Sequence, residues 1–556
     1  MNRLAATKYA GRLLMTLAAI TGILLLGSCG SSGSLPTPNT GSFNNSDLNG
    51  IYVLSISGTD LHTSTGTESF FAVVGTITAD GNGNIKGGTV DINDANLGGT
   101  GVFKETLSAT TYSVTPDGRG SSKLLTSVGD FGLDFVLTSN GHGLVTRFDI
   151  AGSGSGTLDL QGSASQSSLG SLAFSLSGAD YTEANKILPL GTVGAFTPNT
   201  STGAITSGTQ DFNDNGISTV SGSTGLPLSG SVVLSSDTSG TAVLTTSSIF
   251  GSLGFDVWVV DQNHLKFIET DTNTSGYALS GDAFTQQTSF TTGQLVYTIF
   301  GVDSGLVNPV AAGGYATTDA QGDLSNLLED YNDAGTVNTL QNLSGSCATF
   351  VAGRCQLTLP TFSNGTAQEF QFAAYPSSGG VQLLENDGHG LMQGAAFAQT
   401  AKSFAASTGY GLNLSGVNEN PCFNSAGEVD DIAQFNAGSP DTSSTGPANV
   451  SGGIVDENDL ACELNFDRSW GGNYVPDSTA DGRGSISAIA NTLIGGLTLE
   501  YYVVDGSTML FVEGDSSQVA IGTFQAQSSS TSGGAAQSRM TIVHPALRLH
   551  GALRSK

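Results

Sequence analysis

The sequence is poor in charged side chains, and cationic side chains are the scarcest. Only 12% of its 556 residues are charged, against a typical ~25%, and 18 Lys and Arg stand against 47 Asp and Glu. Between Cys29 and Gln527 the balance is 11 basic to 47 acidic residues, a net charge of −36. Such a surface repels phosphate backbones and attracts cations, which argues against a nucleic-acid partner.

Signatures of known catalytic sites are also missing. There is no His-Glu-x-x-His, no Gly-x-Ser-x-Gly and no Walker-type phosphate loop. Of the six histidines, His142 and His264 fall at matching turns, where we expect exposed side chains. Carboxylates such as Glu269 and Asp271 could hydrolyse a glycoside only if two acids faced each other across a cleft. We therefore predict no enzyme, and keep a glycan hydrolase as the third alternative.

Glycine, serine and threonine dominate the uncharged part of the composition. The 77 glycines are about twice the usual ~7%, and helix-forming Lys, Glu and Arg are too rare for a helical core. Short strands joined by turns have this composition.

One motif, Asp-x-Asn-Asp, occurs four times, and its first residue recurs after 120, 119 and 126 residues. The copies comprise Asp91, Asn93 and Asp94; Asp211, Asn213 and Asp214; Asp330, Asn332 and Asp333; and Asp456, Asn458 and Asp459. Such periods exceed the ~20–50 residues of solenoid units, so each repeat is long enough to close its own core.

Each repeat contains about eight alternating segments. In the first, the turns Asp80-Gly81, Asp117-Gly118 and Asn140-Gly141 separate strand-like runs. A meander of eight antiparallel strands loses its exposed edges when it closes. The predicted fold is therefore all-β, with four tandem antiparallel domains, each an eight-stranded up-and-down β-barrel. The predicted divisions are a signal peptide (1–28), a flexible tether (29–46), four barrels (47–163, 166–286, 288–400, 403–527) and a disordered basic tail (528–556).

The N-terminus reads as a targeting segment. Three basic residues precede an apolar stretch from Leu13 to Leu26, and Leu26-Gly27-Ser28-Cys29 follows. This resembles the lipobox of bacterial lipoproteins, which implies acylation of Cys29 and attachment to a membrane. Gly30, in place of an acidic residue, implies outer-membrane sorting by the same resemblance. The alternative is an ordinary signal peptide with a chance cysteine.

The other four cysteines fall in pairs within single repeats. Cys347 and Cys355 belong to the third repeat, and Cys422 and Cys462 to the fourth. An oxidising destination favours two disulfides within domains.

Acidic residues recur at one end of every predicted barrel. Each Asp-x-Asn-Asp motif ends the third strand, and a second acid ends the seventh strand: Asp149, Glu269, Glu385 and Glu513. Clustered hard oxygen ligands suit Ca²⁺, the one cofactor that the sequence suggests. The alternative is structural, with the motif shaping the turn after the third strand and the second acid pairing with a backbone amide or an Arg.

Two resemblances accompany these patterns. The first strand with its glycines and the strand-turn-strand around Asp80 resemble the start of avidin-type and lipocalin-type barrels. The run Asp-Gly-Asn-Gly followed by Gly-Gly-x-x-Asp-x-Asn-Asp is similar to uncharacterised secreted bacterial repeat proteins. This resemblance implies no particular activity.

Together the patterns predict a lipid-anchored cell-envelope protein with a binding, adhesive or structural role. The alternative is a carbohydrate or small-ligand binding protein that uses the acidic rims, with or without calcium. The expected partners are the membrane, through the N-terminal lipid, and a glycan or another envelope protein.

Overall fold

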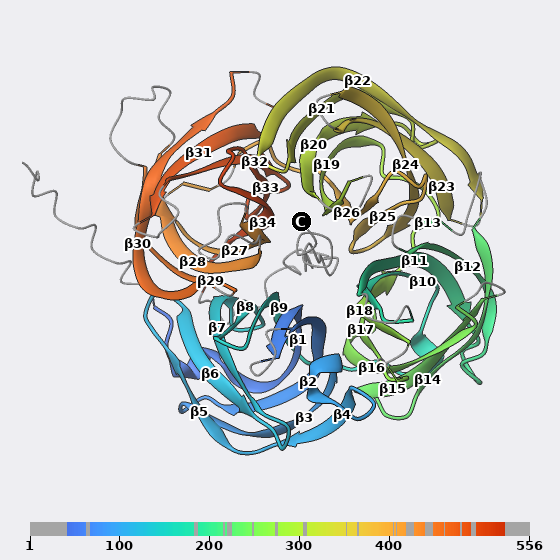
Figure 1. Ribbon diagram of the computed structural model, residues 1–556, viewed down its shortest axis with the longest axis vertical. Coiled ribbons are helices and arrows are strands. Elements are labelled where there is room, and N and C mark those ends of the chain that lie inside the picture. Colours follow the sequence, from blue (N-terminus) through green and yellow to red (C-terminus); the bar gives the residue numbers. More distant parts are fainter. Residues whose placement is uncertain are drawn as a thin grey trace, which may run out of the picture. The chain divides into compact units, whose positions relative to one another are not determined.

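The computed structural model forms four closed antiparallel β-barrels in sequence, which confirms the predicted fold class. Figure 1 labels their strands. The structure describes residues 42–62, 67–182, 187–214, 217–218, 225–246, 250–272, 276–303, 308–351, 353–363, 366–403, 405–406, 408–418, 427–439, 449–460, 462–478, 481–490 and 496–528. Within them, none of the helices has the length and apolar character that a membrane crossing requires.

Barrels 1 and 2 each have one split strand. Both β4 and β5 pair with β3, and both β13 and β14 pair with β12, while β2–β3 and β11–β12 pairing closes each barrel. Barrel 1 contains η1 (Asn45–Asp47), β1 (Asn49–His62), β2 (Thr67–Asp80), β3 (Asn84–Asp94), η2 (Ala95–Leu97), β4 (Val102–Leu107), β5 (Thr110–Val114), β6 (Arg119–Leu125), β7 (Asp130–Ser139), β8 (His142–Asp149) and β9 (Gly152–Leu160). After η3 (Gln166–Ser168), barrel 2 contains β10 (Leu172–Asp180), β11 (Leu188–Pro198), β12 (Ile205–Asp214), β13 (Ile217–Ser218), β14 (Leu226–Leu234), β15 (Ser239–Thr246), β16 (Ser252–Asp261), β17 (His264–Glu269) and β18 (Tyr277–Thr285).

Barrels 3 and 4 are uninterrupted meanders. Barrel 3 contains β19 (Gly293–Val302), β20 (Pro309–Thr318), β21 (Leu324–Asp333), β22 (Thr336–Val351), β23 (Arg354–Ser363), β24 (Thr366–Ser377), β25 (Gly380–Glu385) and β26 (Leu391–Ala398). Barrel 4 contains β27 (Thr408–Asn418), β28 (Gly427–Ala437), β29 (Val450–Asp459), β30 (Glu463–Pro476), β31 (Arg483–Ala490), β32 (Gly496–Val503), β33 (Thr508–Glu513) and β34 (Gln518–Ala526).

The barrel interiors are filled by side chains. Alternate residues of each strand point inward because side chains in a strand have a period of two, and each barrel has its own apolar cluster. In barrel 2 this cluster includes Phe174, Phe196 and Phe212. A cavity inside barrel 1, beside Leu54 and Ile77, measures about 10 Å³, which is scarcely the size of one water. At this place, the core of barrel 1 has room for about one water molecule and no larger ligand.

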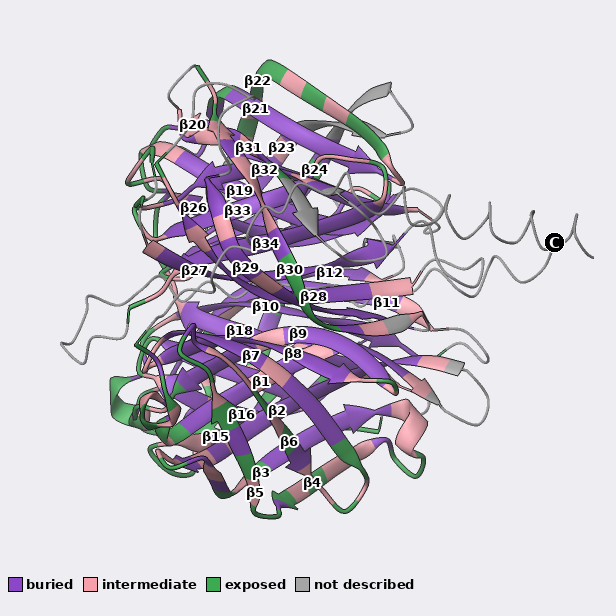
Figure 2. Cartoon of the chain, turned by 90° about the vertical axis from the view of Figure 1, so that its left-hand side faces the viewer, coloured by how far each residue is buried: buried purple, intermediate pink, exposed green. Residues whose placement is uncertain are grey.

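The outward faces of the strands are buried as well, because the barrels pack on one another. Figure 2 shows burial along most of the strands. β2 lies against β17 and β18, β11 against β24 and β25, β20 against β33 and β34, and β28 against β7, β8 and β9. The early strands of each barrel thus contact the late strands of the next, and the fourth barrel contacts the first. Smaller apolar clusters fill each of these joints, for example Val136, Leu144 and Ile432 between barrels 1 and 4.

Candidate functional site

The Asp-x-Asn-Asp motif faces two ways. In barrel 2, Phe212 belongs to the interior cluster, so its strand neighbours Asp211 and Asn213 point outward. Ile92 of barrel 1 and Tyr331 of barrel 3 show the same alternation. The first Asp and the Asn therefore face another barrel, and the last Asp lies on the inner face of its own.

Each motif Asn joins its barrel to the next one in the cycle. Its side-chain amide donates to backbone carbonyls where the seventh strand of the neighbouring barrel ends, and the strand-seven acid is among the acceptors every time. The bonds are Asn93 to Glu269 at 2.9 Å, Asn213 to Glu385 at 2.8 Å, Asn332 to Glu513 at 3.0 Å, and Asn458 to Asp149 at 3.4 Å. Asn458 also donates to the carbonyls of Arg147 and Gly152 at 2.9 and 2.8 Å. The two sets of recurrent polar residues thus meet, but across barrels.

The first Asp of three motifs binds an Arg of the next barrel. Arg354 holds Asp211 through two bonds of 2.7 Å, and Arg483 holds Asp330 through bonds of 2.6 and 2.8 Å. Arg119 reaches Asp456 at 3.3 Å. These ion pairs lie where barrels 2 and 3, 3 and 4, and 4 and 1 meet.

Sequence reasoning missed these three arginines, although a signal existed. Each begins the fifth strand of its barrel directly after a glycine, in Gly118-Arg119, Gly353-Arg354 and Gly482-Arg483. Basic residues are rare in the four barrels, so three arginines at the same position of the repeat indicate a shared role.

The joint between barrels 1 and 2 differs from the other three. Asp91 accepts a hydrogen bond from the indole N–H of Trp258 at 3.0 Å. Burial and the neighbouring Asp256 carboxylate raise the pKa of Asp91 to about 7. Lys104 of barrel 1 forms an ion pair with Asp256 and not with Asp91.

Inside barrel 1, the last Asp of the motif belongs to an acidic group around one buried cation. Arg147 contacts Asp60 at 2.7 Å and Asp149 at 3.1 Å, and its guanidinium lies over the Phe71 ring. Burial and the charge of Asp60 raise the pKa of Asp94 to about 7. Asp149 also accepts the Gly132 and Ala151 N–H groups. This is the predicted pairing of the strand-seven acid with backbone amides and an Arg.

The other three strand-seven acids are fully buried. Burial is the first cause that raises the pKa values of Glu269, Glu385 and Glu513 well above the usual range, and a nearby Asp two residues later adds to it. The described residues include no group of three or more His, Cys, Asp or Glu arranged to hold a metal ion. Calcium binding by the recurrent acids stays a prediction.

The expectation of exposed turn histidines is wrong. His142 and His264 are buried, and they contact Asp159 at 2.7 Å and Asp282 at 2.5 Å. Lys266 of barrel 2, also buried, lies 3.0 Å from Asp282 and 3.7 Å from Asp159 of barrel 1. The reason is packing: the strands that flank these turns face another barrel, so the charges pair in the joint.

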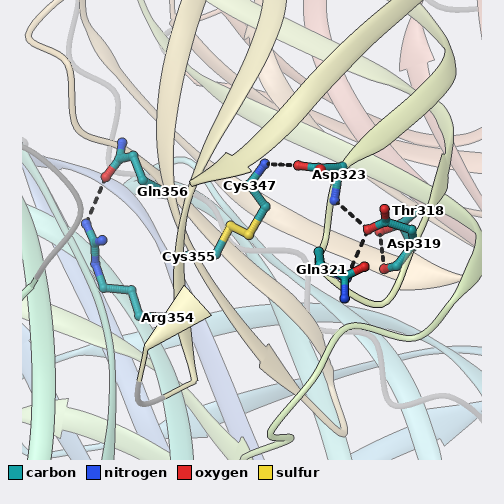
Figure 3. Close-up of a disulfide and its surroundings, with 8 residues drawn as sticks. All are labelled: Thr318, Asp319, Gln321, Asp323, Cys347, Arg354, Cys355 and Gln356. Atoms are coloured by element: carbon teal, nitrogen blue, oxygen red, sulfur yellow. Dashed lines mark hydrogen bonds between the residues drawn. A yellow bond between two sulfur atoms is a disulfide. The ribbon is translucent and has the colours of Figure 1, made fainter. Parts of the chain in front are cut away.

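The disulfide between Cys347 and Cys355 is confirmed, with a Cα–Cα distance of 5.7 Å. Figure 3 shows it beside Asp323, which accepts the Cys347 N–H at 2.8 Å. Cys355 points into the barrel, while its neighbour Arg354 points toward barrel 2. The disulfide therefore ties together the hairpin that carries the joint arginine.

Two predicted cysteine roles lie outside the described residues. These roles belong to Cys29 and Cys422, neither of which is among the described residues. Cys462 is described and is disulfide-bonded. Its pairing with Cys422 and the acylation of Cys29 stay predictions.

No protein-family model matches this sequence, and no curated protein matches it significantly. Solved structures do match at low similarity. Transferrin binding protein B from serogroup B Neisseria meningitidis is 10% identical with a TM-score of 0.19, over 70% of this chain and 84% of that one. The Trp-176-Ala mutant of transferrin binding protein B from Haemophilus parasuis Hp5 has 10% identity, a TM-score of 0.18 and the same coverage. Intact Ap-TbpB, with N and C lobes, is 8% identical with a TM-score of 0.17, over 90% and 97% of the chains. Values this low assign no ligand.

Proposed function

We propose that this chain is a lipid-anchored protein of the bacterial outer membrane, periplasmic or surface-facing, whose four joined barrels form a scaffold for binding a glycan or another envelope protein. The observation that carries the proposal is the use of the repeated motif. The most regular polar residues in the sequence hold barrels together, since all four Asn side chains donate to a neighbouring barrel. A motif used in this way builds a scaffold.

The filled interiors and the loops support a surface-binding role. Apolar side chains occupy the described barrel cores, so a ligand would meet loops or joints. The connection between the first and second strands varies from one barrel to the next, from His62 to Thr67 in barrel 1 and from Asn418 to Gly427 in barrel 4. Variable loops on a rigid scaffold are where binding usually resides.

Anchoring is tested by Cys29→Ser expressed in a bacterial host. The mature protein should move from the membrane fraction to the soluble fraction, and lipid should disappear from its N-terminal peptide. A Cys29→Ser protein that stays at the membrane, or a wild-type N-terminal peptide without lipid, contradicts the anchor.

Binding is tested separately with the purified mature chain on a glycan array and on isolated cell envelopes. Saturable binding without product release supports the proposal. Release of sugar products would favour the glycan hydrolase instead, and no saturable binding to either target contradicts the binding role.

A further inference from the structure

The four joints between barrels are versions of one arrangement, and one of them is incomplete. The joint between barrels 3 and 4 shows the full set. Asp330 accepts two bonds from Arg483 and one from the Tyr502 hydroxyl, and Glu500 lies 2.8 Å from the same guanidinium. One arginine side chain is thus held by three carboxylates, since Asp477 lies 2.6 Å from it as well, next to an aromatic ring.

Strand register identifies the matching residues between barrels 1 and 2. In barrel 4, Arg483 of the fifth strand pairs with Tyr502 of the sixth. In barrel 2, Ser239 pairs with Trp258 in the same way. Ser239 therefore occupies the position of Arg483, and Trp258 that of Tyr502.

Two of these three carboxylates have counterparts at the incomplete joint. Asp91 is the first Asp of its motif, as Asp330 is, and Asp256 precedes Trp258 by two residues, as Glu500 precedes Tyr502. Trp258 bonds Asp91 just as Tyr502 bonds Asp330. The guanidinium of Arg483 has no counterpart among these residues.

The space that an arginine would fill is open. A cleft of about 360 Å³ lies there, and Asp91, Ser239, Asp256 and Trp258 are among its lining residues. This volume is at the lower end of the range for small-ligand pockets. Glu105 and Lys104 also line it, so acidic groups outnumber cations.

Lys104 does not replace the missing arginine. It pairs with Asp256, but its side chain is 65% exposed against 13% for Asp256, so solvent at the lysine end weakens this ion pair. The nearby buried cation Lys266 already has Asp282 and Asp159 as partners. Asp91, which is 4% exposed, accepts the neutral indole N–H and has the Asp256 carboxyl beside it as a second acidic group.

We propose that the cleft between barrels 1 and 2 binds a guanidinium group, supplied by a small solute or by an arginine side chain of a protein partner. Asp91 and Asp256 accept its N–H groups, and the Trp258 ring lies beside its plane. A planar guanidinium can donate two parallel bonds to one carboxylate, as Arg354 does to Asp211, whereas an ammonium cannot. The inference deepens the binding role proposed above by naming a ligand class.

The test uses the fluorescence of Trp258 in the purified mature chain. The protein has two tryptophans, and the other, Trp470, is buried in the core of barrel 4. Agmatine and acetyl-Gly-Arg-Gly-amide should each change the emission saturably, while lysine and citrulline should bind about tenfold more weakly. Trp258→Phe should remove the optical signal, and calorimetry of the wild type reports binding even if the emission does not change.

Two variants decide whether the cleft is the site. Ser239→Arg supplies the missing side chain from within, so it should abolish agmatine binding and raise the melting temperature. Ser201→Arg adds the same side chain at an exposed turn of barrel 2 and should leave binding unchanged. Asp91→Asn should weaken binding about tenfold or more, since it removes the buried charge.

The two probes distinguish the sources. Binding of agmatine alone identifies a small guanidinium solute as the ligand, and binding of the peptide identifies an arginine side chain. Calorimetry without saturable binding of either probe, or agmatine binding that survives Ser239→Arg, overturns the proposal. Membrane attachment and glycan binding are measured independently, so the failure of one proposal is distinguishable from the failure of the other.

Discussion

Arg354 of barrel 3 holds both carboxylate oxygens of Asp211 of barrel 2 at 2.7 Å, and both side chains are buried. The Tyr375 hydroxyl adds a third bond to Asp211 at 2.5 Å. The two partners lie 143 residues apart in the chain. The repeated Asp-x-Asn-Asp motif therefore contributes a contact between domains, in which two buried and opposite charges stabilise each other.

Removing one partner of this pair should destabilise the protein strongly. Arg354→Met leaves Asp211 as an uncompensated buried charge, which costs on the order of 3–5 kcal/mol. The double variant Arg354→Met with Asp211→Leu should recover much of that loss, because no charge is left buried. Thermal or urea unfolding measures both, with the exposed Lys123→Ala as a control that should change nothing. A single variant as stable as the control contradicts the assigned role.

The contact between the first and last barrels should depend on Asn458. Asn458→Ala leaves the carbonyls of Arg147 and Gly152 without their donor, at a cost of about 1–3 kcal/mol. Hydrogen exchange should then rise in β8 and β9, while the exposed Gln262→Ala leaves it unchanged. Unchanged protection of β8 and β9 would show that this bond does not hold the two barrels together.

Stability should fall as the pH rises from about 4 to about 7. Burial is the main cause that raises the pKa values of Asp91, Asp94 and Asp134 to about 7, above the usual ~4. In this window the folded state keeps protons that the unfolded state has lost, so each group favours folding less as the pH increases. The melting temperature should be higher at pH 5 than at pH 8, and Asp134→Asn should reduce the difference. A melting temperature that rises over this range contradicts the assignment.

Non-reducing peptide mapping should find two intradomain disulfides. Cys347 with Cys355 serves as the internal reference, since the structure shows that bond. The second peptide pair should join Cys422 to Cys462. A link from Cys462 to any other cysteine would refute that pairing and would tie the fourth repeat to a different part of the chain.

Calcium should be tested on the mature chain by its effect on melting. The outward Asp is bound by an arginine in barrels 2, 3 and 4, so an ion bound there would use the inward acids, such as Asp214 and Glu269 in barrel 2. At about 100 times its dissociation constant, an ion that binds only the folded state stabilises it by roughly 2.7 kcal/mol. Chelator should reverse the gain, and Asp214→Asn should reduce it. A melting temperature that does not respond to calcium leaves the motif with its structural role alone.

The sequence by itself determined the architecture of each barrel. Alternation and turns such as Asp80-Gly81 and Asn140-Gly141 are local signals, because the period of a strand and the geometry of a tight turn depend on residues close in the chain. The same period of two puts Asp91 and Asn93 on one face of their strand. Cys347 and Cys355 could be paired for the same reason, since only one hairpin separates them.

Only the tertiary structure decided what the outward face touches. The alternation of side chains along the strand shows that Asn213 points away from its own core. It does not show that Asn213 donates a hydrogen bond of 2.8 Å to the backbone carbonyl of Glu385 in another barrel. His142 looked like a solvated turn residue for the same reason, because a turn pattern carries no information about a neighbouring barrel. Periodicity is a property of one segment, whereas burial of a polar side chain and the identity of its partner depend on segments more than a hundred residues apart.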